Sequence, residues 1–273
     1  MNIQSARATA ADQVLLREKV GPIVVLTLNR PAARNSLSEA LLQALDVALT
    51  EIAVDKDVPA VVLAASGTAF CAGHDLKELT SRRTDADGGR AYFRHIMTTC
   101  SAMMQKIVNL PQPVIAAVQG VASAAGCQLV ASCDLAIAST TAGFATPGVD
   151  IGLFCSTPMV ALSRNVARKH AMEMLLTGEI ISAEKAAAIG LVNHVVESGR
   201  EREKALELAE KIASKSSHVV GIGKAAFYRQ LELPLAEAYR YASEVMTENM
   251  MVRDAEEGIG AFIEKRSPTW EDR

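Results

Sequence analysis

The feature that most constrains the fold of this chain is a repeated unit: an uninterrupted apolar run, a turn of small residues and a helical pattern. Residues 60–65 and 114–118 are the two apolar runs. Runs of this length are expected of strands that are buried on both faces of a sheet. After the second run, residues 124–132 have a helical pattern and residues 135–138 read as another strand. This alternation predicts an α/β core with parallel strand pairing.

The N-terminal part has signals of its own. Residues 14–20 and 23–28 are short strand-like runs on either side of Gly21-Pro22, which predicts a β-hairpin. The segment Ser36-Leu37-Ser38-Glu39 fits a capping box and predicts a helix start. Apolar residues then follow at helical spacing on one stripe: Leu41, Leu42, Leu45, Leu49 and Ile52.

The second half of the chain is mostly helical. From residue 156 onward, Ser182 is an expected N-cap, Gly190 an expected residue just past a helix end, and 191–196 a last short strand. Residues 219–266 read as one helix after another, and no linker rich in Pro, Gly or Ser interrupts the chain. The simplest division is a core at 1–200 and a C-terminal helical region at 201–273.

Composition excludes several classes of protein. The 273 residues carry a net charge of −3 with only 6 Phe, 4 Tyr and 1 Trp, so neither the charge nor the stacking rings of a nucleic-acid binder are present. No run of 18 apolar residues predicts a membrane span. The five cysteines form no CxxC pair and the histidines are scattered, so buried free thiols are expected and no metal site. Residues 1–13 lack a signal-peptide pattern, and a cytoplasmic location is therefore predicted.

Two turns place backbone N–H groups where a ligand can reach them. Residues 66–77 and 120–128 each leave a buried strand and enter a helix, whose first N–H groups have no partner within the helix. Small residues allow close approach to the backbone. Two such N–H groups that face each other can bind an oxyanion. The alternative is that both are ordinary strand-to-helix turns, small only because packing is tight.

At these turns the sequence resembles the crotonase superfamily, also called the enoyl-CoA hydratase/isomerase family. The resemblance extends over roughly residues 14–273, in order and with the family's spacing. The sequence is similar to the enoyl-CoA hydratase domain-containing subgroup. It carries the His-Asp-Leu-Lys-Glu-Leu and Ala-Ala-Gly-Cys-Gln-Leu runs of that subgroup. The other matching stretches are Leu28-Asn29-Arg30-Pro31 with Asn35, residues 69–77, residues 113–120, Cys133-Asp134, Leu176-Thr177-Gly178, Gly190-Leu191-Val192 and Glu264-Lys265-Arg266.

This resemblance implies a spiral of ββα units with a C-terminal helical region at 201–273 that assembles a homotrimer or a dimer of trimers. It implies acyl-CoA thioesters as ligands, with coenzyme A as part of the substrate and no tightly bound cofactor. The N–H groups of His74 and Ala125 would bind the thioester oxygen. Apolar residues of the C-terminal helices, such as Met246 and Phe262, would face a partner or pack on their own core. The positions that correspond to the coenzyme A site are Ala32, Ala33, Arg34, Ala72, Asp75, Leu76, Lys77 and Lys265.

The family pattern breaks at the two glutamates that hydratases of the family use as bases. Gln128 and Gly148 stand at these positions. A glutamine orients water but does not take its proton at neutral pH, so little hydratase activity is predicted. The remaining polar candidates are Asp150, which would share a strand face with position 148, and His74, whose ring would either take part in catalysis or face bulk water. Cys155, Ser156 and Thr157 offer a nucleophile or a helix cap.

Three functions remain open at this point. The first is an enzyme that uses only enolate stabilisation, such as a decarboxylase of malonyl-type thioesters, with thioester hydrolysis or double-bond isomerisation through Asp150 as variants. The second is a non-catalytic acyl-CoA-binding protein. The third is an enoyl-CoA hydratase with relocated bases.

Overall fold

The computed structural model describes residues 13–273, so the signal-peptide prediction lies almost wholly outside the described residues. A six-stranded sheet has the strand order β1-β2-β3-β5-β7-β10. Only the β1–β2 pair is antiparallel, and it confirms the predicted hairpin at Gly21, whose φ is +58°. The strands are β1 (Leu15–Val20), β2 (Ile23–Leu28), β3 (Val61–Ala65), β5 (Val114–Val118), β7 (Leu135–Ser139) and β10 (His194–Val196).

A second, four-stranded sheet has the order β4-β6-β8-β9. Three of its strands each follow a strand of the large sheet after a short turn: β3 leads to β4, β5 to β6 and β7 to β8. Each of these pairs is then followed by a helix, which is the predicted repeat of ββα units. The strands are β4 (Ala69–Cys71), β6 (Val121–Ser123), β8 (Gly143–Ala145) and β9 (Ile181–Ser182).

Alternating side chains of the large sheet serve two cores. Val61 and Leu63 of β3 join the main core beneath helices α1, α3 and α4, whereas Val62 on the same strand packs with Ala205 and Ala209 of α8. Burial on both faces confirms the interpretation of the continuous apolar runs. The helices before the C-terminal arm are α1 (Glu39–Val54), α2 (Leu76–Ser81), α3 (Arg90–Asn109), α4 (Ala125–Ser132), α5 (Pro158–Asn165), α6 (Arg168–Thr177), α7 (Ala183–Ala188) and α8 (Glu201–Ala213).

Helix α1 begins two residues later than the capping box predicts. The N-cap is Ser38, whose Oγ accepts a hydrogen bond from the Leu41 N–H at 3.2 Å. The Ser36 hydroxyl instead donates a hydrogen bond to the Asp75 carboxylate, with 3.3 Å between the two oxygens. The predicted apolar stripe of α1 is buried throughout. The cap at Ser182 and the left-handed Gly190 after α7 are also as predicted.

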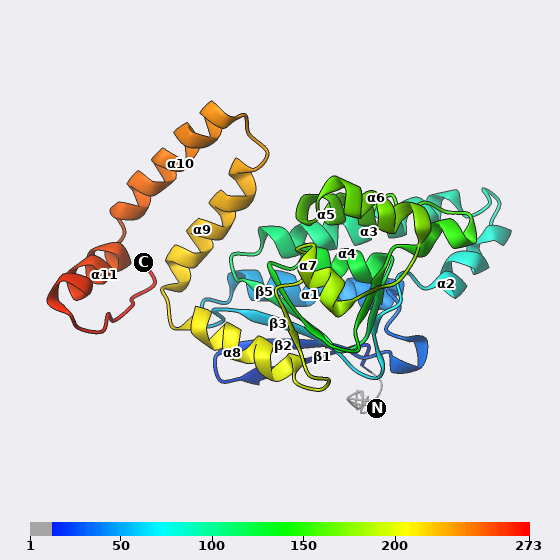
Figure 1. Ribbon diagram of the computed structural model, residues 1–273, viewed down its shortest axis with the longest axis horizontal. Helices are drawn as coiled ribbons and strands as arrows, with labels where there is room; N and C mark the ends of the chain where they lie inside the picture. Colours follow the sequence, from blue (N-terminus) through cyan, green and yellow to red (C-terminus); the bar gives the residue numbers. More distant parts are fainter. Residues whose placement is uncertain (1–12) are drawn as a thin grey trace, which may run out of the picture.

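The C-terminal helices α9 (Ser217–Gln230), α10 (Leu235–Met250) and α11 (Arg253–Glu264) form an arm that extends away from the sheets (Figure 1). Helix α8, which the division at residue 200 assigns to this region, packs instead on the large sheet. The arm is fastened by the buried Lys224, whose Nζ lies 2.6 Å from a carboxylate oxygen of Asp134. The Tyr228 hydroxyl donates to the other oxygen of that carboxylate at 3.0 Å. None of the helices described between residues 13 and 273 is long and apolar enough to cross a membrane.

Candidate active site

The two small-residue turns meet at backbone level. A Cβ added to Gly73 would lie 3.1 Å from the Cβ of Ala124, 3.1 Å from the Ser123 carbonyl oxygen and 3.5 Å from the Ala125 nitrogen. A Cβ added to Gly126 would lie only 2.1 Å from the Cys71 carbonyl oxygen. At Gly126 a side chain would force the two segments apart, and at Gly73 it would be crowded and would also have to adopt a φ of +96°, which favours glycine.

The peptide between Gly73 and His74 is held from one side by the segment before α1. The Leu37 N–H donates to the Gly73 carbonyl at 2.7 Å, and the Asp75 N–H donates to the Leu37 carbonyl at 3.1 Å. Neither bond uses the His74 N–H. Ala125 is the first residue of α4, so its N–H has no acceptor within the helix. The structure therefore places the two predicted oxyanion donors on adjoining segments. Neither N–H group makes a hydrogen bond within the turn or helix to which it belongs.

Buried polar atoms without partners gather around this junction. Of the six buried side-chain polar atoms that make no hydrogen bond in residues 13–273, four belong to this region: both ring nitrogens of His74, the Gln128 Oε1 and the Thr146 Oγ1. Gln128 and Thr146 flank the turn, because the Gln128 N–H donates to the Ala124 carbonyl and the Ala124 N–H donates to the carbonyl of Ala145, the residue before Thr146. A buried polar group left unpaired costs about 1–3 kcal/mol. Such a concentration is typical of a site completed by water or a ligand. Nothing in the sequence pointed to Thr146.

The His74 ring is neutral at physiological pH. Burial lowers the pKa of His74 below its usual value, and the nearby backbone of Leu37 opposes this shift only in part. A neutral imidazole has one donor and one acceptor nitrogen. It therefore adds polarity to the site but no positive charge.

Ala124 is a strained residue that the sequence did not reveal. Its φ of +50° and ψ of −115° lie in a region that L-residues rarely adopt. Such a conformation costs about 1–3 kcal/mol and persists only where its surroundings enforce it. Both turns thus contain a residue with positive φ, glycine at position 73 and alanine at position 124.

Asp75 has a structural task in this chain. Its carboxylate lies 2.9 Å from Nη2 of Arg30 and caps α2 by accepting from the N–H groups of Lys77 and Glu78. Burial raises the pKa of Asp75, but the bonds from Arg30 and the helix N–H groups outweigh it and hold that pKa below its usual value. The group is ionised at neutral pH.

Most of the positions assigned to coenzyme A form one exposed strip. The Ala72 N–H donates to the Arg34 carbonyl at 3.0 Å, which joins the 3₁₀ turn Pro31–Ala33 to the segment that enters α2. Ala32, Arg34, Ala72, Leu76 and Lys77 are all exposed there. Lys265 is separate from them. It follows α11 at the far end of the arm, away from α2 (Figure 1).

The expectation that Asp150 shares a strand face with position 148 is wrong. Residues Pro147–Ile151 form a 3₁₀ helix rather than a strand, since proline has no N–H for a sheet ladder. Asp150 is exposed, and its carboxylate lies 2.9 Å from where a Cβ of Gly178 would be, at the end of α6. It is therefore no substitute for the missing base.

The Cys155 thiol occupies the space beside Gly148. Its Sγ accepts a hydrogen bond from the Gly148 N–H at 3.3 Å and lies 3.0 Å from where a Cβ of Gly148 would be. Burial raises the pKa of Cys155, so the group is a neutral thiol and a weak nucleophile. Ser156 donates to the Phe154 carbonyl, and Thr157 stands at the N-cap of α5 without a capping bond, so the predicted side-chain cap is absent.

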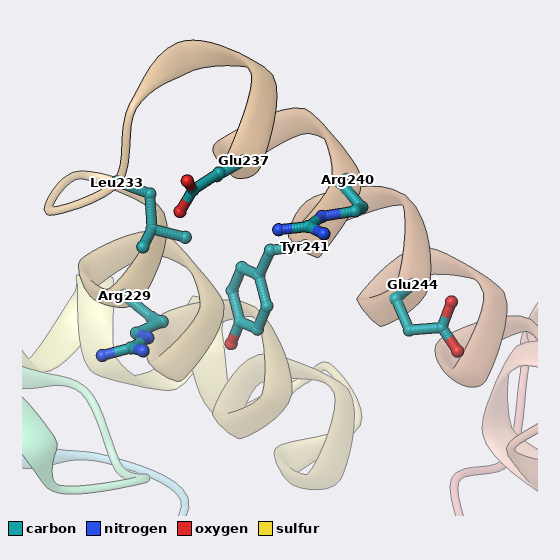
Figure 2. Close-up of a pocket in the computed structure, with 6 residues that line it drawn as sticks. All are labelled: Arg229, Leu233, Glu237, Arg240, Tyr241 and Glu244. Atoms are coloured by element: carbon teal, nitrogen blue, oxygen red, sulfur yellow. The ribbon is translucent and has the colours of Figure 1, made fainter.

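The remaining features lie apart from this junction. A shallow groove between α9 and α10 belongs to the arm (Figure 2), and it is lined by Arg229, Leu233, Glu237, Arg240, Tyr241 and Glu244. All five cysteines are buried free thiols, as predicted. In the described part of the chain, no three His, Cys, Asp or Glu residues gather as a metal site.

Comparison with known proteins agrees with this geometry. The sequence profile described as enoyl-CoA hydratase/isomerase matches residues 18–273. Enoyl-CoA hydratase domain-containing protein 3, mitochondrial, of Rattus norvegicus is 49% identical over 90% of this chain and 80% of that protein. The crystal structure of a Mycobacterium smegmatis enoyl-CoA hydratase has 52% identity and a TM-score of 0.89, over 94% of this chain and 98% of that one. Human enoyl-CoA hydratase domain-containing protein 3 has 47% identity and a TM-score of 0.89, over 94% and 100%.

These matches also decide three predictions. They confirm the crotonase-type fold and the similarity to the domain-containing subgroup. The predicted cytoplasmic location is wrong by the same comparison, because the relatives from Rattus norvegicus, Homo sapiens and Dictyostelium discoideum are all named as mitochondrial. Mitochondrial transit peptides are amphipathic rather than apolar, so the lack of an apolar segment does not exclude them. The profile match over residues 18–273 shows that this chain belongs to the enoyl-CoA hydratase/isomerase family.

Proposed function

We propose that this chain binds acyl-CoA thioesters and stabilises the enolate form of the thioester between the N–H groups of His74 and Ala125. The single observation that carries the proposal is the close approach of the two segments that bear these N–H groups, with the Ala125 nitrogen 3.5 Å from where a Cβ of Gly73 would be. Family membership supplies the ligand class, with coenzyme A entering as part of the substrate and no tightly bound cofactor. The exposed strip around Arg34 and Lys77 is where we place the coenzyme A portion.

The chemistry follows from where charge develops. When an acyl thioester loses a group from C2, the electron pair moves into the carbonyl and leaves negative charge on its oxygen. Fixed N–H donors aimed at that oxygen stabilise the charge without reorganisation, and losing one donor of this kind costs about 2.7–4 kcal/mol. The His74 ring is close to the donors but neutral. It therefore adds no positive charge that would attract the enolate oxygen away from them.

We further propose that hydration is not the reaction of this site. Water addition to an enoyl thioester needs a base, and general acid/base groups contribute roughly 10²–10⁴-fold each. Gln128 and Gly148 supply no carboxylate, and the exposed Asp150 is directed to the end of α6. Decarboxylation of a malonyl-type thioester needs no base, because the bond to the carboxylate breaks, carbon dioxide leaves, and the electron pair forms the enolate. Solvent then protonates C2.

Acetoacetyl-CoA is the direct probe of this proposal, because its enolate is visible by near-ultraviolet absorbance. The wild-type chain is expected to bind acetoacetyl-CoA and to lower the apparent pKa at which its enolate forms by about two units. One donor contributes at least about 2.7 kcal/mol, and each pKa unit equals 1.36 kcal/mol. Malonyl-CoA should lose carbon dioxide, and crotonyl-CoA should not be hydrated at ordinary hydratase rates. Binding with no enolate and no turnover would leave a non-catalytic acyl-CoA-binding protein. Rapid hydration would establish relocated bases instead.

The exposed arm supports the proposal of a homotrimer or a dimer of trimers. Several large apolar residues of α10 and α11 do not pack on their own core, since Phe262 is 85% and Met246 62% exposed. An apolar surface of this kind marks an interaction site. Lys265, remote from the coenzyme A strip of its own chain, is then available to the strip of another copy. Sedimentation at the mass of a monomer would refute this assembly.

A further inference from the structure

We propose that Ala124 is a positioning residue whose methyl group, held in a left-handed backbone conformation, sets the spacing between the N–H donors of His74 and Ala125. This inference rests on the proposed oxyanion hole and deepens it. Ala124 itself offers no donor or acceptor to a ligand. It would act through the two residues that do.

Both peptide groups of Ala124 are fixed. Its N–H donates to the Ala145 carbonyl at 2.9 Å, and its carbonyl accepts from the Gln128 N–H at 3.0 Å. The first bond joins the turn to the small sheet, and the second begins α4. The residue therefore cannot relax its φ of +50° without breaking a sheet bond or a helix bond.

The methyl group lies between the two donor segments. It is 3.1 Å from where a Cβ of Gly73 would be, so it packs directly on that glycine, and Gly73 immediately precedes His74. Ala124 in turn immediately precedes Ala125. The two segments also meet at Gly126, where an added Cβ would lie 2.1 Å from the Cys71 carbonyl oxygen. Of the three atoms nearest to the Cβ position at Gly73, the methyl is the only side-chain atom, so removing it leaves the Ser123 carbonyl oxygen and the Ala125 nitrogen as the neighbours there.

Glycine would adopt this conformation without strain. Alanine and glycine at position 124 differ only in the packed methyl group. If the strained alanine has an effect on the turn that glycine would not have, that effect must therefore come from the methyl group. Ala124→Gly is therefore expected to move two properties in opposite directions. The fold becomes more stable, and the oxyanion hole becomes less well organised.

The test measures both properties on the full-length chain. Ala124→Gly is expected to raise Tm by about 2–4 °C, the shift typical of a modest stabilisation in a chain of this size. The apparent pKa of the acetoacetyl-CoA enolate bound to this variant is expected to rise by about one unit, since small misplacements of reacting groups cost an order of magnitude or more. Affinity for coenzyme A alone should stay unchanged.

Two further variants separate positioning from general effects. Ala124→Ser keeps a Cβ and should retain the wild-type enolate pKa. Ala131→Gly, the same change in the last turn of α4, should lower Tm and leave the enolate pKa unchanged. An unchanged enolate pKa in Ala124→Gly, or a fall in its Tm, would overturn the inference. If the wild-type chain forms no enolate with acetoacetyl-CoA, the proposed function itself fails, and the two failures are therefore distinguishable.

Discussion

Returning the two missing carboxylates is the sharpest test of why this site should not hydrate enoyl thioesters. Gln128→Glu places a carboxylate on α4 in a side chain of nearly the same size, and it is expected to fold. Gly148→Glu is different, because its Cβ would lie 3.0 Å from the Cys155 Sγ, 3.1 Å from the Cys155 nitrogen and 3.2 Å from the Leu153 carbonyl oxygen. Two of these three neighbours are backbone atoms, which cannot turn aside as a side chain can.

The cost of that crowding sets the expected result. Forcing extra atoms into a well-packed region costs about 1–3 kcal/mol. In a chain of this size, each kcal/mol lowers Tm by about 2–4 °C. The double variant of positions 128 and 148 is expected to be less stable by this amount and to hydrate crotonyl-CoA poorly, because the second carboxylate is displaced with its loop. The single variant Gln128→Glu regains at most one acid/base factor of about 10²–10⁴.

The assay follows the loss of enoyl thioester absorbance from crotonyl-CoA beside thermal unfolding of each variant. Gly223→Glu is the matched control, because Gly223 is an exposed position in α9 where an added Cβ meets nothing within 4 Å. That control is expected to keep the wild-type Tm or exceed it, since glycine is a poor helix former. A double variant with the Tm of this control and a hydration rate raised by four or more orders of magnitude would refute the crowding at position 148.

Three other perturbations test the surrounding structure. Lys224→Met leaves the Asp134 carboxylate buried without its cation, so unfolding in urea should show a loss of about 3–5 kcal/mol, and a loss below 1 kcal/mol would show that the pair does not fasten the arm. Arg30→Gln removes the ion pair to Asp75 and should cost about 1–3 kcal/mol by the same measurement, whereas an unchanged midpoint would contradict its role. The lowered pKa of His74 means that the unfolded chain binds its proton first as pH falls, so stability should decrease below about pH 6.5. His74→Gln should remove part of that decrease, and an identical pH profile would refute it.

Local signals predicted the elements that depend on neighbours in sequence. Two residues between two strand-like runs set the hairpin at Gly21, and one apolar stripe identified the buried face of α1. The capping-box prediction of the start of α1 was wrong by two residues, because Ser36 and Ser38 are both suitable N-caps. The choice between them was made by Asp75, which is distant in the sequence and binds Ser36 in space.

The parts of the site that escaped prediction depend on contacts between segments. Asp150 was assigned to a strand by its distance from position 148, but the backbone turns at Pro147 and directs its side chain to α6. Thr146 carries no pattern of its own and becomes notable only because its hydroxyl is buried without a partner. The conformation of Ala124 results from the sheet on one side and α4 on the other, which no local sequence pattern reports.

The site separates two kinds of catalytic group that respond differently to substitution. The proposed oxyanion donors are main-chain N–H groups, so an alanine at position 125 retains the donor, and only the spacing of the segments matters. The bases of a hydratase are side chains, and a single substitution at position 128 or 148 removes each of them completely. A chain of this fold can therefore lose water addition while it keeps enolate stabilisation. The packing of Cys155 beside Gly148 would make such a loss harder to reverse, because any side chain at position 148 must first displace the Cys155 segment.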